Sequence, residues 1–192
     1  EPLLFCEKKG VTQKILKHSG VLVISGSLHK LSFLQSEYAQ RKGFEMMCVD
    51  ELEGFSDNEN FEATEEAILG ILALYERSHK LIIKTAGTRA ALDDSQDIFA
   101  AGEIIVNNFG QLVSRLFKKG FDGMLVVSGG DTLGGIMERM GKYSVEPIAE
   151  VEPGVVLASI DNETGSHQII TKSGGFGSLE IYEKIYLHVK KV

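Results

Sequence analysis

Short apolar runs alternate with longer amphipathic runs along most of the chain, and this alternation limits the fold more than any other feature. The first apolar run, Val21–Ser25, precedes a helical pattern from Leu31 to Lys42. The order then repeats, with predicted strands at 44–50, 81–87 and 123–130 and helices at 61–77, at 98–119 and after Thr132. Such alternation is typical of right-handed crossovers between parallel strands. We therefore predict a doubly wound α/β domain, a mostly parallel sheet with helices on both faces.

The rhythm changes after Gly141. Segments 145–160 and 167–174 are β-rich and are joined by a predicted turn at 161–165, and a final helix is expected at 178–189. The first twenty residues lack periodicity, so we expect 1–20 to be a linker or peripheral segment. The predicted domain spans 21–192 and has a β-rich C-terminal part.

Composition restricts the classes of partner. The 192 residues carry a formal net charge of −7, and adjacent Lys and Arg residues occur only as isolated pairs, a pattern that argues against a nucleic-acid partner. No apolar run is long enough for a membrane span, so no membrane partner is expected. Cys6 and Cys48 stand far apart and no secretory signal opens the sequence, which favours a cytoplasmic protein without a disulfide framework or a zinc site.

Small and glycine-rich turns follow the predicted strands. In open parallel sheets, ligands bind at the carboxyl ends of the strands, so residues just after each strand are the candidates for a site. Backbone N–H groups in such turns form concavities for anions such as nucleotide phosphates. The alternative for each segment is a plain turn without a ligand. The candidate segments are 26–29, 85–88, 129–132 and 171–178.

Two of these turns are unusually rich in glycine. Gly129 and Gly130 allow a sharp turn and a close approach to a ligand, and we expect Asp131 and Thr132 to cap the helix that follows. The second turn packs a lysine, a serine and three glycines into six residues. Its candidate binding residues are Lys172, Gly174, Gly175 and Gly177.

Common nucleotide signatures are missing from the sequence. Gly129 and Gly134 have Walker A spacing, but Gly135 and Ile136 follow where Lys and Ser or Thr belong. No G-x-G-x-x-G occurs, which argues against a nicotinamide-dependent oxidoreductase. Segment 92–97 is interpreted as an acidic helix cap. Of the five scattered histidines, His29 alone lies in a candidate turn.

The chain resembles the nucleotide-binding C-terminal domain of the four-carbon acid sugar kinase family, formerly a domain of unknown function. The resemblance covers about Val21 to Val192 and is carried by four segments in the family's order: "VISGSLHKLSFLQ", "VVSGGDT", "EVEPGV" and "TKSGGFGS". In the first segment, Gly26, Ser27, Ser32 and Gln35 fit the family pattern, whereas His29 stands where the family usually has serine.

The resemblance implies ATP-dependent phosphorylation of a terminal hydroxyl on a four-carbon sugar acid of the threonate, erythronate or oxo-tetronate type. It carries ATP contacts to Ser27, to 129–132, and to Gly174 or Gly175. His29, which departs from the family pattern in the first segment, is kept as a further candidate binding residue. Phosphoryl transfer needs charge neutralisation, so we expect Lys172 near the phosphates and Mg²⁺ near Asp131. Asp131 is alternatively the catalytic base that accepts the proton of the sugar hydroxyl.

Family members are about twice as long and have an N-terminal domain that binds the sugar acid. We therefore expect this chain to be one domain of a two-domain kinase, to bind ATP weakly, and to phosphorylate nothing without its partner domain. The alternative is a non-catalytic α/β module that senses a nucleotide or another ligand. The sequence does not fix the oligomeric state, and a homodimer is one assembly that it allows.

Overall fold

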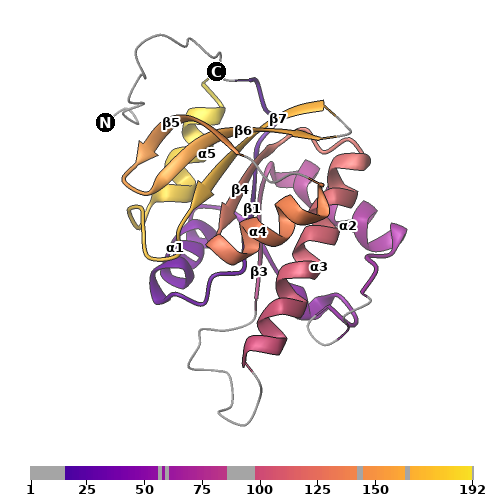
Figure 1. Cartoon of the computed structure of the whole chain (residues 1–192). Coiled ribbons are helices and arrows are strands. Elements are labelled where there is room, and N and C mark those ends of the chain that lie inside the picture. Colours follow the sequence, from indigo (N-terminus) through magenta and orange to yellow (C-terminus); the bar gives the residue numbers. More distant parts are fainter. Residues whose placement is uncertain are drawn as a thin grey trace.

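A computed structural model describes residues 16–55, 58, 61–85, 98–141, 145–162 and 165–191. Its centre is a seven-stranded sheet with the strand order β2-β3-β1-β4-β7-β6-β5 (Figure 1). The strands are β1 (Val21–Ser25), β2 (Glu45–Cys48), β3 (Lys80–Lys84), β4 (Met124–Ser128), β5 (Glu146–Glu152), β6 (Val155–Asn162) and β7 (Gly165–Lys172). The helices are α1 (Lys30–Arg41), α2 (Glu65–Ser78), α3 (Ile98–Lys118), α4 (Gly130–Arg139) and α5 (Ile181–Val189), with a 3₁₀ turn, η1 (Val49–Glu51).

The middle of the sheet is parallel and fully covered. Every residue of β1 and β4 is buried, as expected for strands with helices on both faces. β7 also runs parallel to β4, whereas β6 and β5 are antiparallel additions at one edge. The prediction of a mostly parallel doubly wound sheet with a β-rich C-terminal part is therefore confirmed.

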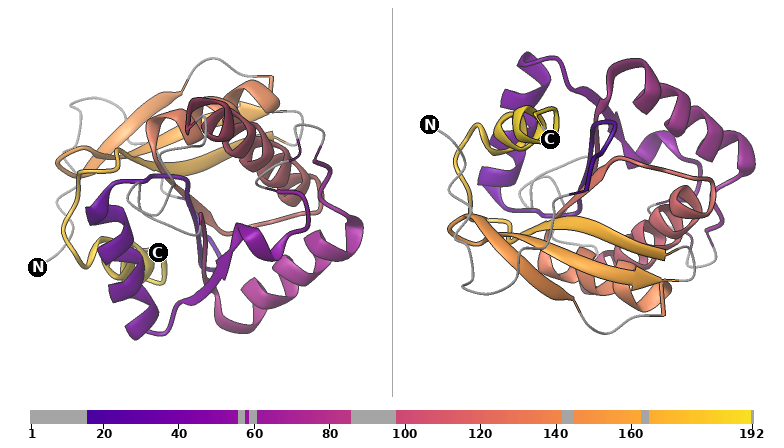
Figure 2. Two further views of the ribbon diagram at one scale, coloured as in Figure 1. Left: turned by 90° about the horizontal axis from the view of Figure 1, so that it is seen from below. Right: turned by 90° about the horizontal axis from the view of Figure 1, so that it is seen from above.

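Helices form a layer on each face of the sheet (Figure 2). One hydrophobic core joins α2, α3 and α4 to the side chains of Leu22 and Ile24 in β1. The other core joins α1 and α5 to Val21 and Val23, which point to the opposite face because side chains alternate along a strand. The apolar faces of the amphipathic helices are thus buried in two separate cores, one on each face of the sheet.

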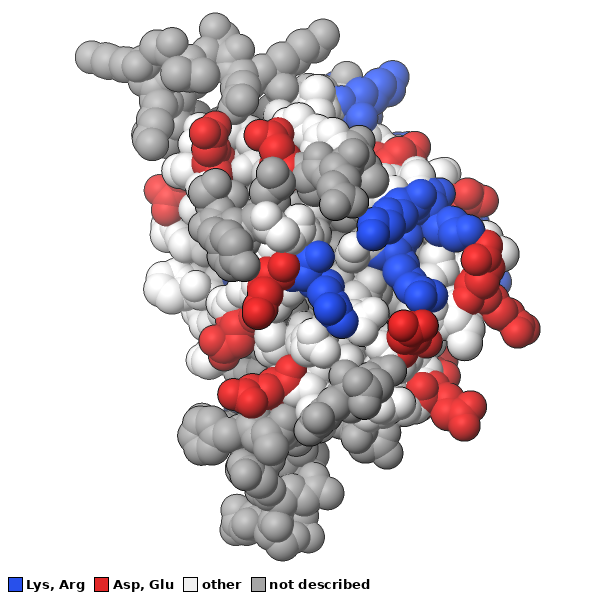
Figure 3. Space-filling model, turned by 45° about the vertical axis from the view of Figure 1, so that its right-hand side comes forward, with Lys and Arg blue, Asp and Glu red and all other residues white. Residues whose placement is uncertain are grey.

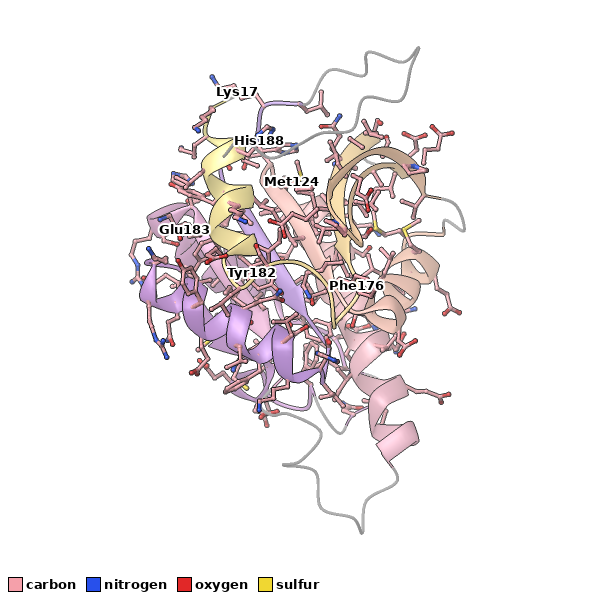
Figure 4. The ribbon with its side chains drawn as sticks, turned by 90° about the vertical axis from the view of Figure 1, so that its left-hand side faces the viewer. Lys17, Met124, Phe176, Tyr182, Glu183 and His188 are labelled. Carbon is pink, nitrogen blue, oxygen red and sulfur yellow. The ribbon has the colours of Figure 1, made fainter. Side chains whose placement is uncertain are left out.

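Strand register aligns the carboxyl ends of four parallel strands. Ser25 of β1 pairs with Lys84 of β3 and with Ser128 of β4, and Ser128 pairs in turn with Lys172 of β7. The turns that follow these strands therefore start at one level of the sheet. The amino ends of the strands lie on the opposite side of the molecule. Figure 4 shows this side by Met124, the first residue of β4, and it also labels Lys17 and His188 there.

Several element boundaries differ from the predictions. The helix expected at 61–77 spans Glu65–Ser78, and the one expected at 178–189 spans Ile181–Val189. Segment 145–160 forms β5 and β6 with a break at Gly154, whose φ is +73°. Of the predicted linker 1–20, only 16–20 is described, and Leu16 N–H donates to Gln168 Oε1.

Three further predictions lie partly or wholly outside the described residues. They concern the acidic helix cap at 92–97, the end of the turn at 85–88, and Cys6. Within the described ranges, no helix combines the length and the apolar character that crossing a membrane requires.

Candidate functional site

Three of the predicted turns meet at the carboxyl edge of the sheet. A Cβ atom built on Gly174 would lie 2.2 Å from the Oγ atom of Ser27, and one on Gly26 would lie 2.2 Å from the Oγ1 atom of Thr132. Both distances are far below van der Waals contact, so neither position has room for a side chain. The segments after β1, β4 and β7 therefore touch, with the glycine backbone of one turn against a side-chain hydroxyl of the next.

This meeting point opens into a cavity of about 1070 Å³. The cavity brings together eight of the predicted binding residues: Ser27, His29, Gly129, Gly130, Asp131, Thr132, Gly174 and Gly175. Lys172 and Gly177 are absent from the described lining. The remaining described lining residues are Gly26, Leu28, Lys30, Thr85, Gly102, Glu103, Ile105, Val106 and Gly134.

The first turn of α4 faces the cavity without a side-chain cap. The helix begins at Gly130, and its N-cap is Gly129 with a φ of +122°, a conformation that favours glycine. The prediction that Asp131 and Thr132 cap this helix is therefore wrong, because both lie inside its first turn. Uncapped N–H groups and the helix dipole make such an end suited to an anion.

His29 is the N-cap of α1 and lines the cavity as well. Its Nδ1 accepts the N–H of Leu31 at 3.1 Å, and its own N–H donates to Ser27 Oγ at 3.2 Å. A ring nitrogen thus supplies the acceptor that a serine would otherwise supply at an N-cap. The ring also lies beside Gly175, where a built Cβ would be 3.2 Å from Nε2. The other four histidines are not among the described lining residues.

Lys172 ends β7 with only 2% of its surface exposed. Its Nζ donates to the carbonyl oxygens of Ser173, Gly174 and Phe176 at 3.0, 3.2 and 3.3 Å. Burial lowers the pKa of this ammonium to about 8. Gly177, with a φ of +81°, packs against Val155 instead of the cavity.

The second wall of the cavity comes from α3 and was missed in the sequence. Gly102, Glu103, Ile105 and Val106 lie on it, although the sequence indicated only an amphipathic helix there. Charge at the site is mixed, since Lys30, Glu103 and Asp131 are the charged residues of the described lining. On the face shown in Figure 3, Lys and Arg side chains are bordered by Asp and Glu.

The cavity wall offers the carboxylate of Asp131 to a magnesium ion, which would be held mainly by the phosphates of a bound nucleotide. Among the described residues, no three His, Cys, Asp or Glu side chains gather as a metal site. Mg²⁺ in phosphoryl-transfer sites is commonly held by one or two carboxylates together with substrate phosphates. The exposed carboxylate of Asp131, on the cavity wall, fits that pattern.

Comparisons with known proteins agree with this geometry. A family model described as a nucleotide-binding C-terminal domain matches residues 22–181. A 3-oxo-tetronate kinase of Burkholderia multivorans is 30% identical over 95 residues, which make up 49% of this chain and 22% of that kinase.

Solved structures share the fold at low identity. A Haemophilus influenzae protein of the domain family DUF1537 has a TM-score of 0.69 and 20% identity, over 92% of this chain and 42% of that one. A domain of the same family from Bordetella bronchiseptica, solved with bound citrate as a domain-swapped dimer, has a TM-score of 0.68 and 20% identity, over 91% and 42%. This chain therefore spans about two fifths of each of those proteins.

The family model covers most of the sheet and all three turns that form the cavity. This agreement confirms the resemblance that the glycine segments indicated. The chain belongs to the family of nucleotide-binding C-terminal domains.

Proposed function

We propose that this chain is the ATP-binding domain of a kinase that phosphorylates a terminal hydroxyl of a four-carbon sugar acid. The observation that carries the proposal is the convergence of three glycine turns on one cavity beside an uncapped helix end. Phosphoryl transfer depends mainly on positioning and charge neutralisation, which backbone N–H groups supply well. The similarity to a 3-oxo-tetronate kinase supports the substrate class.

The phosphates would lie between the first turn of α4 and the turn at Gly174 and Gly175. Lys30 is the lysine of the described lining, so we assign the direct cationic contact to it. The apolar side chains of Leu28, Ile105 and Val106 offer a surface for the base on the same cavity. Ser27 completes the floor, where its Oγ meets the backbone of Gly174.

Asp131 has two candidate roles, as a ligand of Mg²⁺ and as the base for the sugar hydroxyl. Mg²⁺ supplies charge neutralisation between the phosphates when it is bound. Titration of wild type and Asp131→Asn with ATP, with and without Mg²⁺, separates the roles. A ligand role predicts that the variant loses the gain in affinity that Mg²⁺ gives the wild type. A base role predicts that this gain persists.

The sugar acid would be held by a second domain, because the chain spans about two fifths of the related structures. We expect the chain alone to bind Mg-ATP and to leave threonate, erythronate and oxo-tetronate unphosphorylated. The test is a phosphorylation assay with these acids, on the chain alone and on a protein that includes the second domain. Turnover by the chain alone would contradict the proposal that a second domain must hold the sugar acid. No turnover by either protein would favour a non-catalytic module. A cytoplasmic location and a homodimer remain predictions.

A further inference from the structure

Buried polar side chains hold the turn at 173–178, which we call the glycine turn. Lys172 places its ammonium against three carbonyl oxygens of this turn and 3.3 Å from the hydroxyl of Ser32 in α1. Within the described part of the chain, no carboxylate pairs with it. A buried charge without a counter-ion is costly, and hydrogen bonds are what offset that cost. Here the carbonyl oxygens of the turn supply most of them.

Gln35 holds the other half of the glycine turn. Its side chain is fully buried in α1, and its Nε2 lies 3.0, 3.1 and 3.0 Å from the carbonyl oxygens of Phe176, Gly177 and Ser178. Ser32 adds a hydrogen bond of 2.8 Å to the carbonyl oxygen of Gly174. None of these three side chains belongs to the described lining of the cavity.

The orientation of these carbonyl groups fixes the orientation of the N–H groups. In a planar trans peptide, the C=O and the N–H point in opposite directions. The carbonyls of Ser173 and Gly174 point to Lys172, so the N–H groups of Gly174 and Gly175 point away from it. Both glycines line the cavity, and among the described residues neither N–H has an acceptor.

We infer that Lys172 and Gln35 are positioning residues, which hold the glycine turn so that the N–H groups of Gly174 and Gly175 face a bound nucleotide phosphate. This inference rests on the proposed function. Lys172 was expected to contact the phosphate directly. In this inference it instead holds the backbone of the turn, and the backbone N–H groups contact the phosphate. Figure 4 shows Phe176 on the glycine turn, which leads into α5, the helix that carries Tyr182.

Other charged groups flank the glycine turn at its ends. Glu152 of β5 accepts the N–H of Ser178 at 2.7 Å and pairs with Lys184 of α5 at 2.8 Å. Partial burial raises the pKa of Glu152, but the hydrogen bonds from Lys184 and Ser178 outweigh it and leave the pKa below its usual value. His29 lies over Gly175 at the other end. Any pH test must therefore compare wild type with a Lys172 variant.

The first experiment measures the turn without nucleotide. Backbone ¹⁵N order parameters of Gly174, Gly175 and Gly177 are compared in wild type, Lys172→Met and Gln35→Leu. We expect values to fall from about 0.85 toward about 0.6 in both variants. Gln40→Leu, on the exposed side of α1, is the matched control and should leave the turn rigid. Using two variants protects the test should Lys172→Met fail to fold.

The second experiment measures affinity for Mg-ATP. Both variants should bind about tenfold more weakly, because a loosened turn no longer holds the N–H groups of Gly174 and Gly175 toward the phosphate, and losing a hydrogen bond to a charged group costs about that factor. Lys30→Met should also weaken binding but leave the turn rigid, because Lys30 lines the cavity. In wild type, affinity should fall as the pH rises from about 7 to about 9, through the lowered pKa of Lys172 near 8. In Lys172→Met this component of the profile should vanish.

The outcomes separate the inference from the proposed function. Unchanged order parameters in folded Lys172→Met and Gln35→Leu would overturn the inference, whatever binds. A rigid turn with affinity lost only in Lys172→Met would also overturn it, because that result means direct contact. A loosened turn in a chain whose wild type binds no nucleotide would support the holding role and contradict the proposed function alone.

Discussion

Gly174 lies at the contact between the turn after β1 and the turn after β7. A Cβ at this position would overlap Ser27 Oγ at 2.2 Å and approach the Cβ of His29 at 3.0 Å. Moving Ser27 Oγ away would break its hydrogen bond with the N–H of His29, and the Cβ of His29 is fixed to the backbone of the turn that leads into α1. The sequence predicts Gly174 as a binding residue, and the structure gives a physical reason for a glycine at this position.

At the residue scale, we predict that Gly174→Ala separates the two turns. The expected result is a fall of about 1–3 kcal/mol in the free energy of unfolding, typical of overpacking, and about tenfold weaker binding of Mg-ATP. Urea unfolding and calorimetry measure the two effects. Gly70→Ala is the control, since its Cβ on α2 would meet nothing within 4 Å. That substitution should raise stability by about 0.5–1 kcal/mol. Wild-type affinity in Gly174→Ala would argue against the contact.

At the element scale, α3 and α4 approach each other through glycines. A Cβ on Gly135 would lie 2.4 Å from Cγ1 and 2.6 Å from the carbonyl oxygen of Val106, and one on Gly110 would lie 2.4 Å from the carbonyl oxygen of Gly135. Val106 also lines the cavity. The spacing of the two helices therefore sets the width of the site.

We expect Gly135→Ala to push α4 away from α3. The unfolding free energy should fall by about 1–3 kcal/mol, despite the better helix propensity of alanine. Gly134→Ala is a matched control on the same helix, because its Cβ would lie in open space. Denaturant unfolding of both variants measures the difference. Equal stability would show that the helices can separate at no cost.

The sequence predicted elements better than their contacts. Continuous apolar runs were enough to place β1 and β4, because strands that are buried on both faces are apolar throughout. The helical spacing of apolar residues was enough to place the long helix α3. These patterns did not show that α4 begins at Gly130. Asp and Thr are both common N-cap residues, so Asp131 and Thr132 were expected to precede the helix instead of lying in its first turn. The α3 wall and the burial of Lys172 depend on how helices and strands pack, which one sequence does not encode locally.

At the scale of the whole molecule, three histidines make stability depend on pH. Burial lowers the pKa of His18, His167 and His188, and the neighbouring His18 lowers that of His167 further. The unfolded chain takes up these protons near the usual value of 6.5, before the folded chain does. The free energy of unfolding should therefore fall as the pH drops from about 7 to about 5.

Urea titrations at several pH values test this dependence. The slope between about pH 7 and about pH 5 should shrink in the double variant His18→Gln and His167→Gln, because those protons no longer link to unfolding. Carboxylates with lowered pKa values, such as Glu152, contribute mainly below about pH 5, at the acid end of this window. An unchanged slope in the double variant would show that other groups carry the acid sensitivity.

The whole domain is proposed to bind a nucleotide where its three turns meet. Calorimetric titration of the chain with Mg-ATP and with NAD, repeated on Gly175→Val, tests this claim most directly. A valine at this position would crowd the ring of His29, which lies 3.2 Å from a built Cβ, and would extend into the cavity. The account predicts that Mg-ATP binds, that NAD does not, and that Gly175→Val weakens ATP binding at least about tenfold. Binding of NAD in preference to Mg-ATP, or ATP affinity unchanged in the variant, would contradict it.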